Sequence, residues 1–132
     1  MLTSLAYSSV SNIPARSPEM LELARTCLAR NPALGITGAL YFDGDQFFQV
    51  IEGEEDNVHA LFERIRGDNR HSGVQLLWDG PIEHRRFGTW AMKFVDGTSR
   101  GCRLRPRFSD EKLRVGDTAR CRRRLEEALA AA

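Results

Sequence analysis

One stretch of eight residues, Gln46–Gly53, constrains the fold more than any other part of the chain. It reads QFFQVIEG, and glycine and acidic residues flank it on both sides. Aromatic and β-branched residues between such turn signals predict a β-strand. Side chains alternate along a strand, so one face carries Phe47, Gln49 and Ile51, and the other carries Phe48 and Val50. Both faces are apolar, so we expect both to be covered by other parts of the chain.

Gln49 is the polar exception on its face, because it lies between Phe47 and Ile51. A primary amide has two donor hydrogens and an acceptor oxygen to satisfy. Burying such a group without partners costs roughly 1–3 kcal/mol. Gln49 therefore needs a partner, and a backbone carbonyl or a buried water would serve as well as a bound molecule.

The chain has 132 residues, of which 42% are hydrophobic and 28% charged, which suits one soluble domain. No apolar run approaches the ~20 residues that cross a bilayer, and the first residues lack the features of a signal peptide. We therefore expect a cytoplasmic protein without membrane contact. Three cysteines without CxxC spacing (Cys27, Cys102 and Cys121) argue against a disulfide framework, and the three scattered histidines predict no metal site.

Charge is distributed unevenly along the chain. Residues 1–100 carry 10 basic and 13 acidic side chains, whereas residues 101–132 carry 9 and 5. The basic run Arg122-Arg123-Arg124 is typical of a solvated helix face. Nucleic-acid binding is the less favoured alternative, because no aromatic residues interleave with the run to stack on bases.

Two helices alternate with five strands in the first 95 residues. Ser17-Pro18 predicts the start of the first helix, and Asn31-Pro32 predicts its end. The second helix follows the acidic residues after Gly53 and ends near Gly67. The strands that we expect around the central one are Leu2–Ser8, Gly35–Phe42, Gly73–Trp78 and Gly88–Val95.

This order, β-α-β-β-α-β-β, predicts an α+β fold of the ferredoxin-like type with a five-stranded mixed sheet. Right-handed crossovers place both helices on one face of the sheet. A further helix, Asp117–Ala131, is expected on the other face, over Phe48 and Val50. We divide the chain into a sheet domain, residues 1–97, and a C-terminal helical extension, residues 98–132.

The helix-side face of this sheet collects an unusual set of side chains: Tyr7, Gln49, Trp90 and Met92, with Asn31 at the end of the first helix. Each has a structural explanation, as a core ring, a core filler or a helix cap. Together they offer a phenol, two carboxamides and a thioether in an apolar setting, which favours a site for a planar polar heterocycle.

Five motifs in order identify a family. They are LAYSS at residues 5–9, Asn31 followed by GITG at 35–38, FFQVIEG at 47–53, DNRH at 68–71, and RFGTWAM at 86–92. The chain resembles the BLUF domains, blue-light sensors that use FAD, over about residues 2–95. The resemblance implies an FAD-binding photoreceptor of the short single-domain type, and not an enzyme.

The resemblance also assigns roles. Tyr7 would donate an electron and then a proton to the excited flavin, and Gln49 would connect its hydroxyl to the flavin edge. The residues expected to bind the cofactor are Tyr7, Arg30, Asn31, Leu40, Phe47, Gln49, Ile65, Asp68, Arg70, His71 and Met92. Trp90 and Met92 would carry the signal, and which of the two lies next to Gln49 is left open. Arg30 stands where some members have histidine or asparagine.

Light would reverse the hydrogen bonds of Gln49 by rotation or by tautomerisation, a choice that the sequence leaves open. The change would pass through the fifth strand and the C-terminal segment to an unidentified protein partner, and we expect self-association. One alternative is a flavin-free protein-interaction module. Another is an enzyme of the acylphosphatase type, for which the loop after the first strand offers Arg16 but no glycine-rich phosphate cradle.

Overall fold

The computed structural model describes residues 1–98 and 118–131. Its elements are β1 (Leu2–Ser11), α1 (Pro18–Arg30), the short 3-10 helix η1 (Pro32–Leu34), β2 (Thr37–Phe42), β3 (Gln46–Glu54), α2 (Glu55–Arg66), β4 (His71–Pro81), β5 (Lys93–Asp96) and α3 (Thr118–Ala131). This order confirms the predicted α+β fold with a C-terminal helix.

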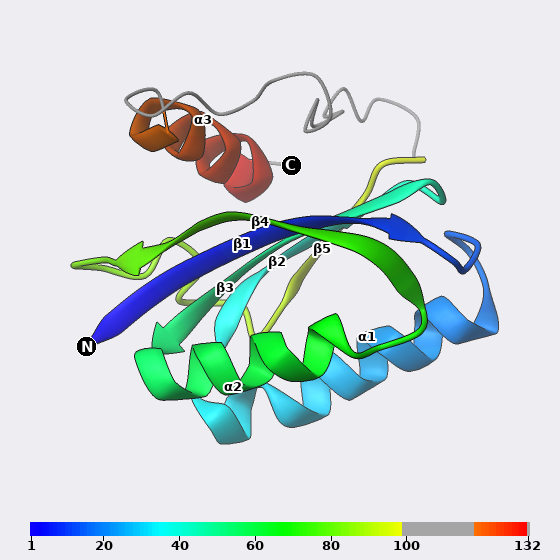
Figure 1. Ribbon diagram of the computed structural model, residues 1–132, viewed down its shortest axis with the longest axis horizontal. Coiled ribbons are helices and arrows are strands. Elements are labelled where there is room, and N and C mark those ends of the chain that lie inside the picture. The colour runs from blue at the N-terminus through cyan, green and yellow to red at the C-terminus, as the bar shows by residue number, and fades with distance from the viewer. Residues whose placement is uncertain (99–117, 132) are drawn as a thin grey trace.

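The five strands form one mixed sheet in the order β4-β1-β3-β2-β5. The pairs β1–β4, β1–β3 and β2–β3 are antiparallel, and β2–β5 is parallel. Figure 1 shows α1 and α2 side by side on one face of the sheet and α3 across the other. Both predicted placements of the helices are therefore confirmed.

The alternation of β3 divides the core into two layers. On the helix side, Phe47 and Ile51 join the cluster that includes residues of α1 and α2. On the opposite side, Phe48 and Val50 are fully buried with Leu129 of α3. Burying a side chain of this size contributes about 1.5–3 kcal/mol. Each face of β3 is thus a core of its own, and α3 completes the second one.

The ends of α1 follow from local chemistry. The hydroxyl of Ser17 accepts a hydrogen bond from the Met20 amide at 3.2 Å, and Pro18 occupies the first turn. At the other end the amide of Asn31 still donates to the Cys27 carbonyl at 2.9 Å. The helix ends where the sequence predicts, but Asn31 keeps α-helical angles (φ −62°, ψ −42°), so exclusion from the α region is not the reason. Pro32 has no amide hydrogen with which to continue the helix. Asn31 is thereby fixed at the end of α1, against the sheet.

The fifth strand is the main departure from expectation. The sequence predicts a strand over Gly88–Val95, but β5 contains only Lys93–Asp96. Before it, the Trp90 amide turns back to the Phe87 carbonyl, which interrupts the extended backbone. Trp90 and Met92 are therefore not alternate residues of one strand, and the shared face predicted for them is not formed.

Candidate functional site

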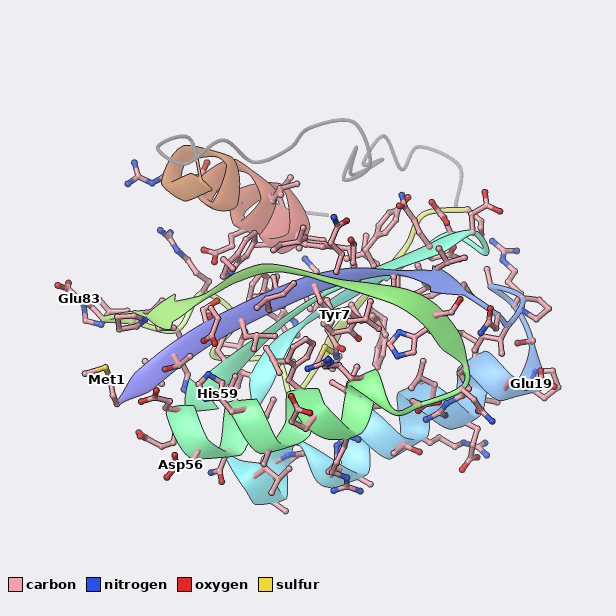
Figure 2. All side chains as sticks on the ribbon, in the orientation of Figure 1. Met1, Tyr7, Glu19, Asp56, His59 and Glu83 are labelled. Carbon is pink, nitrogen blue, oxygen red and sulfur yellow. The ribbon has the colours of Figure 1, made fainter. Side chains whose placement is uncertain are left out.

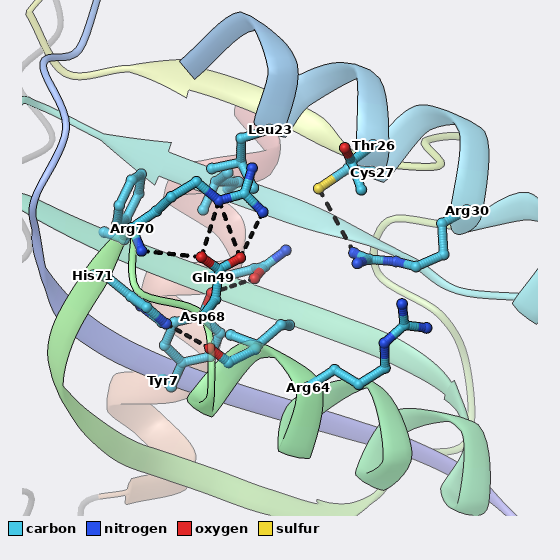
Figure 3. A pocket seen from close by; sticks show the side chains of 13 residues that line it. Tyr7, Leu23, Thr26, Cys27, Arg30, Gln49, Arg64, Asp68, Arg70 and His71 are labelled. Atoms are coloured by element: carbon cyan, nitrogen blue, oxygen red, sulfur yellow. Dashed lines mark hydrogen bonds and ion pairs between the residues drawn. The ribbon is translucent and has the colours of Figure 1, made fainter. Parts of the chain in front are cut away.

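A pocket of about 240 Å³ opens between α1, α2 and the sheet. Figure 3 shows the side chains that line it. Nine of them belong to the predicted cofactor-binding set: Tyr7, Arg30, Leu40, Phe47, Gln49, Ile65, Asp68, Arg70 and His71. The fold thus brings residues from four strands, two helices and the loop between α2 and β4 to one cavity. Figure 2 places Tyr7 inside the layer between the sheet and α2.

Tyr7 and Gln49 face one another across β1 and β3, where they are register partners. The Tyr7 hydroxyl donates a hydrogen bond to Oε1 of Gln49. Nε2 of Gln49 in turn donates to the Met92 sulfur at 3.7 Å. The two polar residues are 4% and 3% exposed, so this short chain of bonds is isolated from solvent. In this structure the residue that adjoins Gln49 is Met92.

Aromatic rings enclose the Tyr7 phenol. Phe62 stacks on it with ring centroids 5.8 Å apart, and His71 meets it edge-on at 5.9 Å. Burial raises the pKa of Tyr7. The phenol is therefore neutral at physiological pH and keeps its proton as a hydrogen-bond donor.

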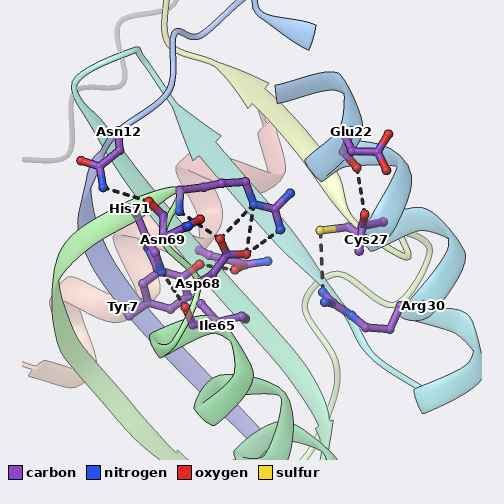
Figure 4. A network of polar contacts seen from close by, with 12 residues as sticks. Tyr7, Asn12, Glu22, Cys27, Arg30, Ile65, Asp68, Asn69 and His71 are labelled. Carbon is purple, nitrogen blue, oxygen red and sulfur yellow. Dashed lines mark hydrogen bonds and ion pairs between the residues drawn. The ribbon is translucent and has the colours of Figure 1, made fainter. Parts of the chain in front are cut away.

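His71 is held at both ring nitrogens. Nδ1 lies 2.7 Å from the Ser9 hydroxyl oxygen, and Nε2 lies 2.6 Å from the carbonyl oxygen of Ile65. The contact with Ile65, drawn in Figure 4, ties the first residue of β4 to the end of α2, and the contact with Ser9 ties it to β1. They keep the His71 ring against Tyr7 and against Phe47, whose centroid is 6.2 Å away.

Asp68 and Arg70 form an ion pair at the same end of the pocket. Arg70 Nε lies 3.0 Å from both carboxylate oxygens, and a terminal nitrogen lies 2.5 Å from Oδ2. The hydrogen bonds from Arg70 lower the pKa of Asp68 below its ordinary value. Both side chains are a little more than a quarter exposed, so the pair sits at the rim.

Asn31 is fully buried, and its side chain is turned toward the segment before β5. Its Nδ2 donates to the Ala91 carbonyl at 2.8 Å, and its Oδ1 accepts from Arg30 Nε at 3.3 Å. Arg30 also points a terminal nitrogen at the Cys27 sulfur, 3.8 Å away. Asn31 therefore adjoins the pocket through Arg30, and its predicted cofactor contact stays a prediction.

Trp90 lies elsewhere. It is 36% exposed, its ring centroid is 6.3 Å from that of Phe87, and the Lys93 ammonium sits 4.7 Å above the ring. Phe87 belongs to the α3-side core, so Trp90 packs away from Gln49. The expectation that Trp90 faces the pocket is wrong for this structure, because the turn at Phe87–Trp90 directs it outward. Its signalling role stays a prediction.

Four further residues line the pocket that the sequence analysis did not assign: Leu23, Thr26, Cys27 and Arg64. A helical signal for two of them existed, since Leu23 and Cys27 precede Arg30 at the i, i+4, i+7 spacing of one helix face. The pattern indicates a core face equally well, so it could not separate a pocket wall from packing. Arg64 is exposed on α2 and gives no such signal.

Two negative findings hold for the part of the chain that the structure describes. Within residues 1–98 and 118–131, no cluster of three or more His, Cys, Asp or Glu side chains could hold a metal ion. Over the same residues, no helix is long and apolar enough to cross a membrane.

Residues 2–93 match the family model described as sensors of blue-light using FAD, the BLUF family. The chain belongs to the BLUF family. Among curated BLUF relatives, it is 39% identical over 94 residues to photoactivated adenylate cyclase subunit beta of Euglena gracilis. That match covers 70% of this chain but 11% of the relative.

A second BLUF relative is the blue light- and temperature-regulated antirepressor BluF of Escherichia coli, 33% identical over 73% of this chain and 24% of its own length. The chain thus spans a minor part of these curated relatives. Among solved structures, the dark state of the BLUF protein BlrB matches with a TM-score of 0.78 and 32% identity, over 98% of this chain and 96% of that one. The photo-activated state of BlsA matches with a TM-score of 0.72 and 27% identity, over 100% and 96%.

Proposed function

We propose that this chain is a blue-light photoreceptor that binds FAD non-covalently in the pocket between α1, α2 and the sheet. The observation that carries the proposal is the bonded chain from Tyr7 through Gln49 to Met92, because its first two members line that pocket. A redox-active phenol joined to a reversible amide is the minimum that such a switch needs. Membership of the BLUF family supports the same conclusion.

The residues present fit a flavin. Apolar side chains of Leu40, Phe47 and Ile65 offer walls for a planar ring, and the Gln49 amide offers a polar edge. Figure 3 shows the side chain of Arg64, from α2, extending toward that of Arg30, from α1, whose guanidinium is directed at Cys27. No carboxylate among the described residues pairs with Arg64, so its guanidinium is available to a flavin carbonyl or a phosphate.

When bound and excited by blue light, the flavin supplies an electron acceptor. Tyr7 would be the donor of the electron, and its hydroxyl would pass the accompanying proton along the bond to Gln49. Burial keeps the phenol neutral before excitation, so its proton is held in the hydrogen bond to Oε1 of Gln49.

Gln49 is the residue whose changed hydrogen bonds would store the light signal. Its oxygen faces Tyr7 and its nitrogen faces the Met92 sulfur, which is a weak acceptor. Rotation of the amide turns its oxygen toward Met92 and removes the donor from the sulfur, whereas tautomerisation leaves the nitrogen in place and makes the oxygen a donor. The segment before β5 and the α3 layer beyond it then respond, and we propose that they pass the change to a protein partner rather than to a catalytic site in this chain.

The test is an absorption spectrum of the purified chain with FAD, in the dark and under blue light. We expect a yellow protein whose spectrum shifts to the red and recovers in the dark. Gln49→Leu should keep the flavin and lose the shift, because leucine nearly preserves the volume and removes every hydrogen bond. A full shift in this variant would exclude Gln49 as the switch.

The flavin-free interaction module remains as a second class of function, and a chain that stays colourless after incubation with FAD would favour it. The acylphosphatase alternative loses its one candidate residue. Arg16 is 72% exposed and reaches Asp96 at 3.5 Å, away from the pocket.

A further inference from the structure

Glu52 is a fully buried carboxylate that the proposed mechanism does not use. It follows Gln49 by three residues on β3 and therefore points to the opposite, α3-facing side of the sheet. Its Oε1 accepts from the Thr37 hydroxyl at 3.0 Å and from the Phe87 amide at 2.9 Å. Its Oε2 accepts from the Arg86 amide at 2.7 Å. Both oxygens act as acceptors, which is the pattern of an ionised carboxylate.

A cation stands behind this group without touching the carboxylate. Arg85 donates from one terminal nitrogen to the Thr37 hydroxyl at 2.9 Å and to the backbone carbonyl of Glu52 at 3.1 Å. A buried charge is tolerated when it is hydrogen-bonded and compensated nearby. Three hydrogen-bond donors thus hold the Glu52 carboxylate, and the positive charge of Arg85 is bonded to Thr37, which is one of these donors.

The anchored segment lies between β4 and β5 and contains no helix or strand. Its regular hydrogen bonds are few, so side chains determine its course. Glu52 holds its first half through two backbone amides, and Asn31 holds its second half through the Ala91 carbonyl. Met92 follows Ala91 directly. Buried backbone groups almost always find partners, and for the amides of Arg86 and Phe87 and the carbonyl of Ala91 these partners are side chains. The Trp90 carbonyl accepts from the Gly38 amide of β2 at 3.3 Å.

One strand therefore contacts this segment from both sides of the sheet. Gln49 touches Met92 on the pocket side, and Glu52 captures the backbone of Arg86 and Phe87 on the other. We propose that Glu52 is a positioning residue of the photoreceptor, which holds the segment so that the Met92 sulfur stays against the Gln49 amide. The inference rests on the proposed function and adds a residue that contacts neither Tyr7 nor the pocket.

The same anchor reaches α3. The side chain of Arg86, whose amide binds Glu52, forms an ion pair with Glu126 at 3.2 Å. Glu126 is 2% exposed and lies on α3. A displacement of the segment at Met92 would thus reach α3 through Arg86, because Glu52 binds the Arg86 amide and the Arg86 side chain pairs with Glu126. This places Glu52 between the switch and the surface from which a signal would leave.

Glu52→Gln tests the proposal with little change in volume. The new amide nitrogen would face the backbone N–H of either Arg86 or Phe87. Because an amide nitrogen does not accept a hydrogen bond, that buried donor loses its acceptor. The chain has three methionines, so methyl-labelled methionine NMR gives few, assignable signals. In the flavin-free protein we expect the Met92 resonance to move, while that of Met20, buried on α1, stays in place.

With FAD bound, we expect the dark recovery of Glu52→Gln to change by about tenfold or more, the scale set by one unsatisfied buried donor. The matched control is Glu54→Gln on the same strand. Its carboxylate is 64% exposed and pairs with the N-terminus, so both readouts should stay at their wild-type values.

A purely structural role for Glu52 predicts a lower melting temperature with an unmoved Met92 resonance and unchanged recovery, and that result would overturn the proposal. If Glu52→Gln does not fold, Thr37→Val takes its place, since it removes one donor to Glu52 and keeps the charge. A folded Thr37→Val with both readouts at wild-type values would overturn the proposal equally. A wild-type chain without a light response would refute the proposed function, while the flavin-free resonance would still report on the position of Met92.

Discussion

The Tyr7 hydroxyl makes the bond to Gln49 and, in the proposed mechanism, carries the proton that accompanies the electron. Tyr7→Phe keeps the ring and its stacking on Phe62. Loss of the hydrogen bond costs about 0.5–1.5 kcal/mol, which is small against the ~5–15 kcal/mol that stabilises a domain. We expect the variant to fold and bind FAD but to form almost none of the red-shifted state, as measured by transient absorption.

Trp90 supplies the control for this experiment, because it is the other oxidisable ring that the sequence suggested. It packs on Phe87 outside the pocket, so Tyr7→Phe with Trp90→Phe should behave as Tyr7→Phe alone. Normal, high-yield photochemistry in Tyr7→Phe would show that Tyr7 is not the donor.

The contact between α2 and β4 gives the fold a pH dependence. His59 Nε2 lies 3.0 Å from Asp79 Oδ1, and this hydrogen bond raises the pKa of His59 above its ordinary 6.5. The contact therefore stabilises the folded state fully below pH 6.5, and its contribution is lost as the pH rises through the raised pKa. Both side chains reach solvent, so the effect is small.

Asp79→Asn should move the His59 pKa back toward 6.5 and remove this part of the pH dependence. An NMR titration of the ring protons measures the shift, and the other two histidines serve as internal references. Identical His59 titrations in the two proteins would show that the contact does not persist in solution.

The packing of α3 on the sheet depends on Leu129, which is fully buried against the Phe48 side of β3. Truncating a buried leucine costs about 2–5 kcal/mol when the cavity cannot collapse. We expect Leu129→Ala to lower the free energy of unfolding by that amount in urea, and Glu127→Ala, on the exposed side of α3, to change it little. Equal stability of the two variants would mean that α3 is not docked in solution.

In the molecule as a whole, β4 and β5 are the edges of the sheet. An edge strand presents backbone groups to a second chain, and β5 pairs with β2 on one side only among the described residues. We expect a defined oligomer of the full chain, measured by sedimentation equilibrium over a range of concentrations. A strict monomer at every concentration would contradict self-association.

A chain ending at residue 100 separates the contribution of the C-terminal extension. Without α3, the apolar face around Phe48 and Val50 loses its cover, so this truncation should form larger and less uniform species than the full chain. The proposed boundary between residues 97 and 98 stays a prediction, because residues 99–117 lie outside the described part of the chain. Cys102 and most of the basic residues of the C-terminal extension lie in this same range.

Much of the site could be predicted because its residues obey local rules. Strand alternation places Gln49 with Phe47 and Ile51 and puts Tyr7 on the same face of the sheet. The family resemblance implies that the two meet, and the register of β1 with β3 makes them partners. The cap at Ser17 and the stop at Pro32 fix where Asn31 falls. Cys27 shows what such rules cannot predict. Residues on a helix face that packs against a core have the same sequence spacing as residues on a face that lines a pocket.

Residue patterns in the chain predict the order of the elements and the two faces of β3, because each follows from near neighbours or from chain topology, and the family resemblance adds the pairing of Tyr7 with Gln49. That Met92 rather than Trp90 adjoins Gln49 emerges from the folded chain alone. The segment before β5 has no periodicity of its own, and its course depends on Glu52 and Asn31, which lie 34 or more residues earlier in the chain. Contacts between side chain and backbone over such distances leave no repeating pattern in a sequence, so the fold alone reveals them.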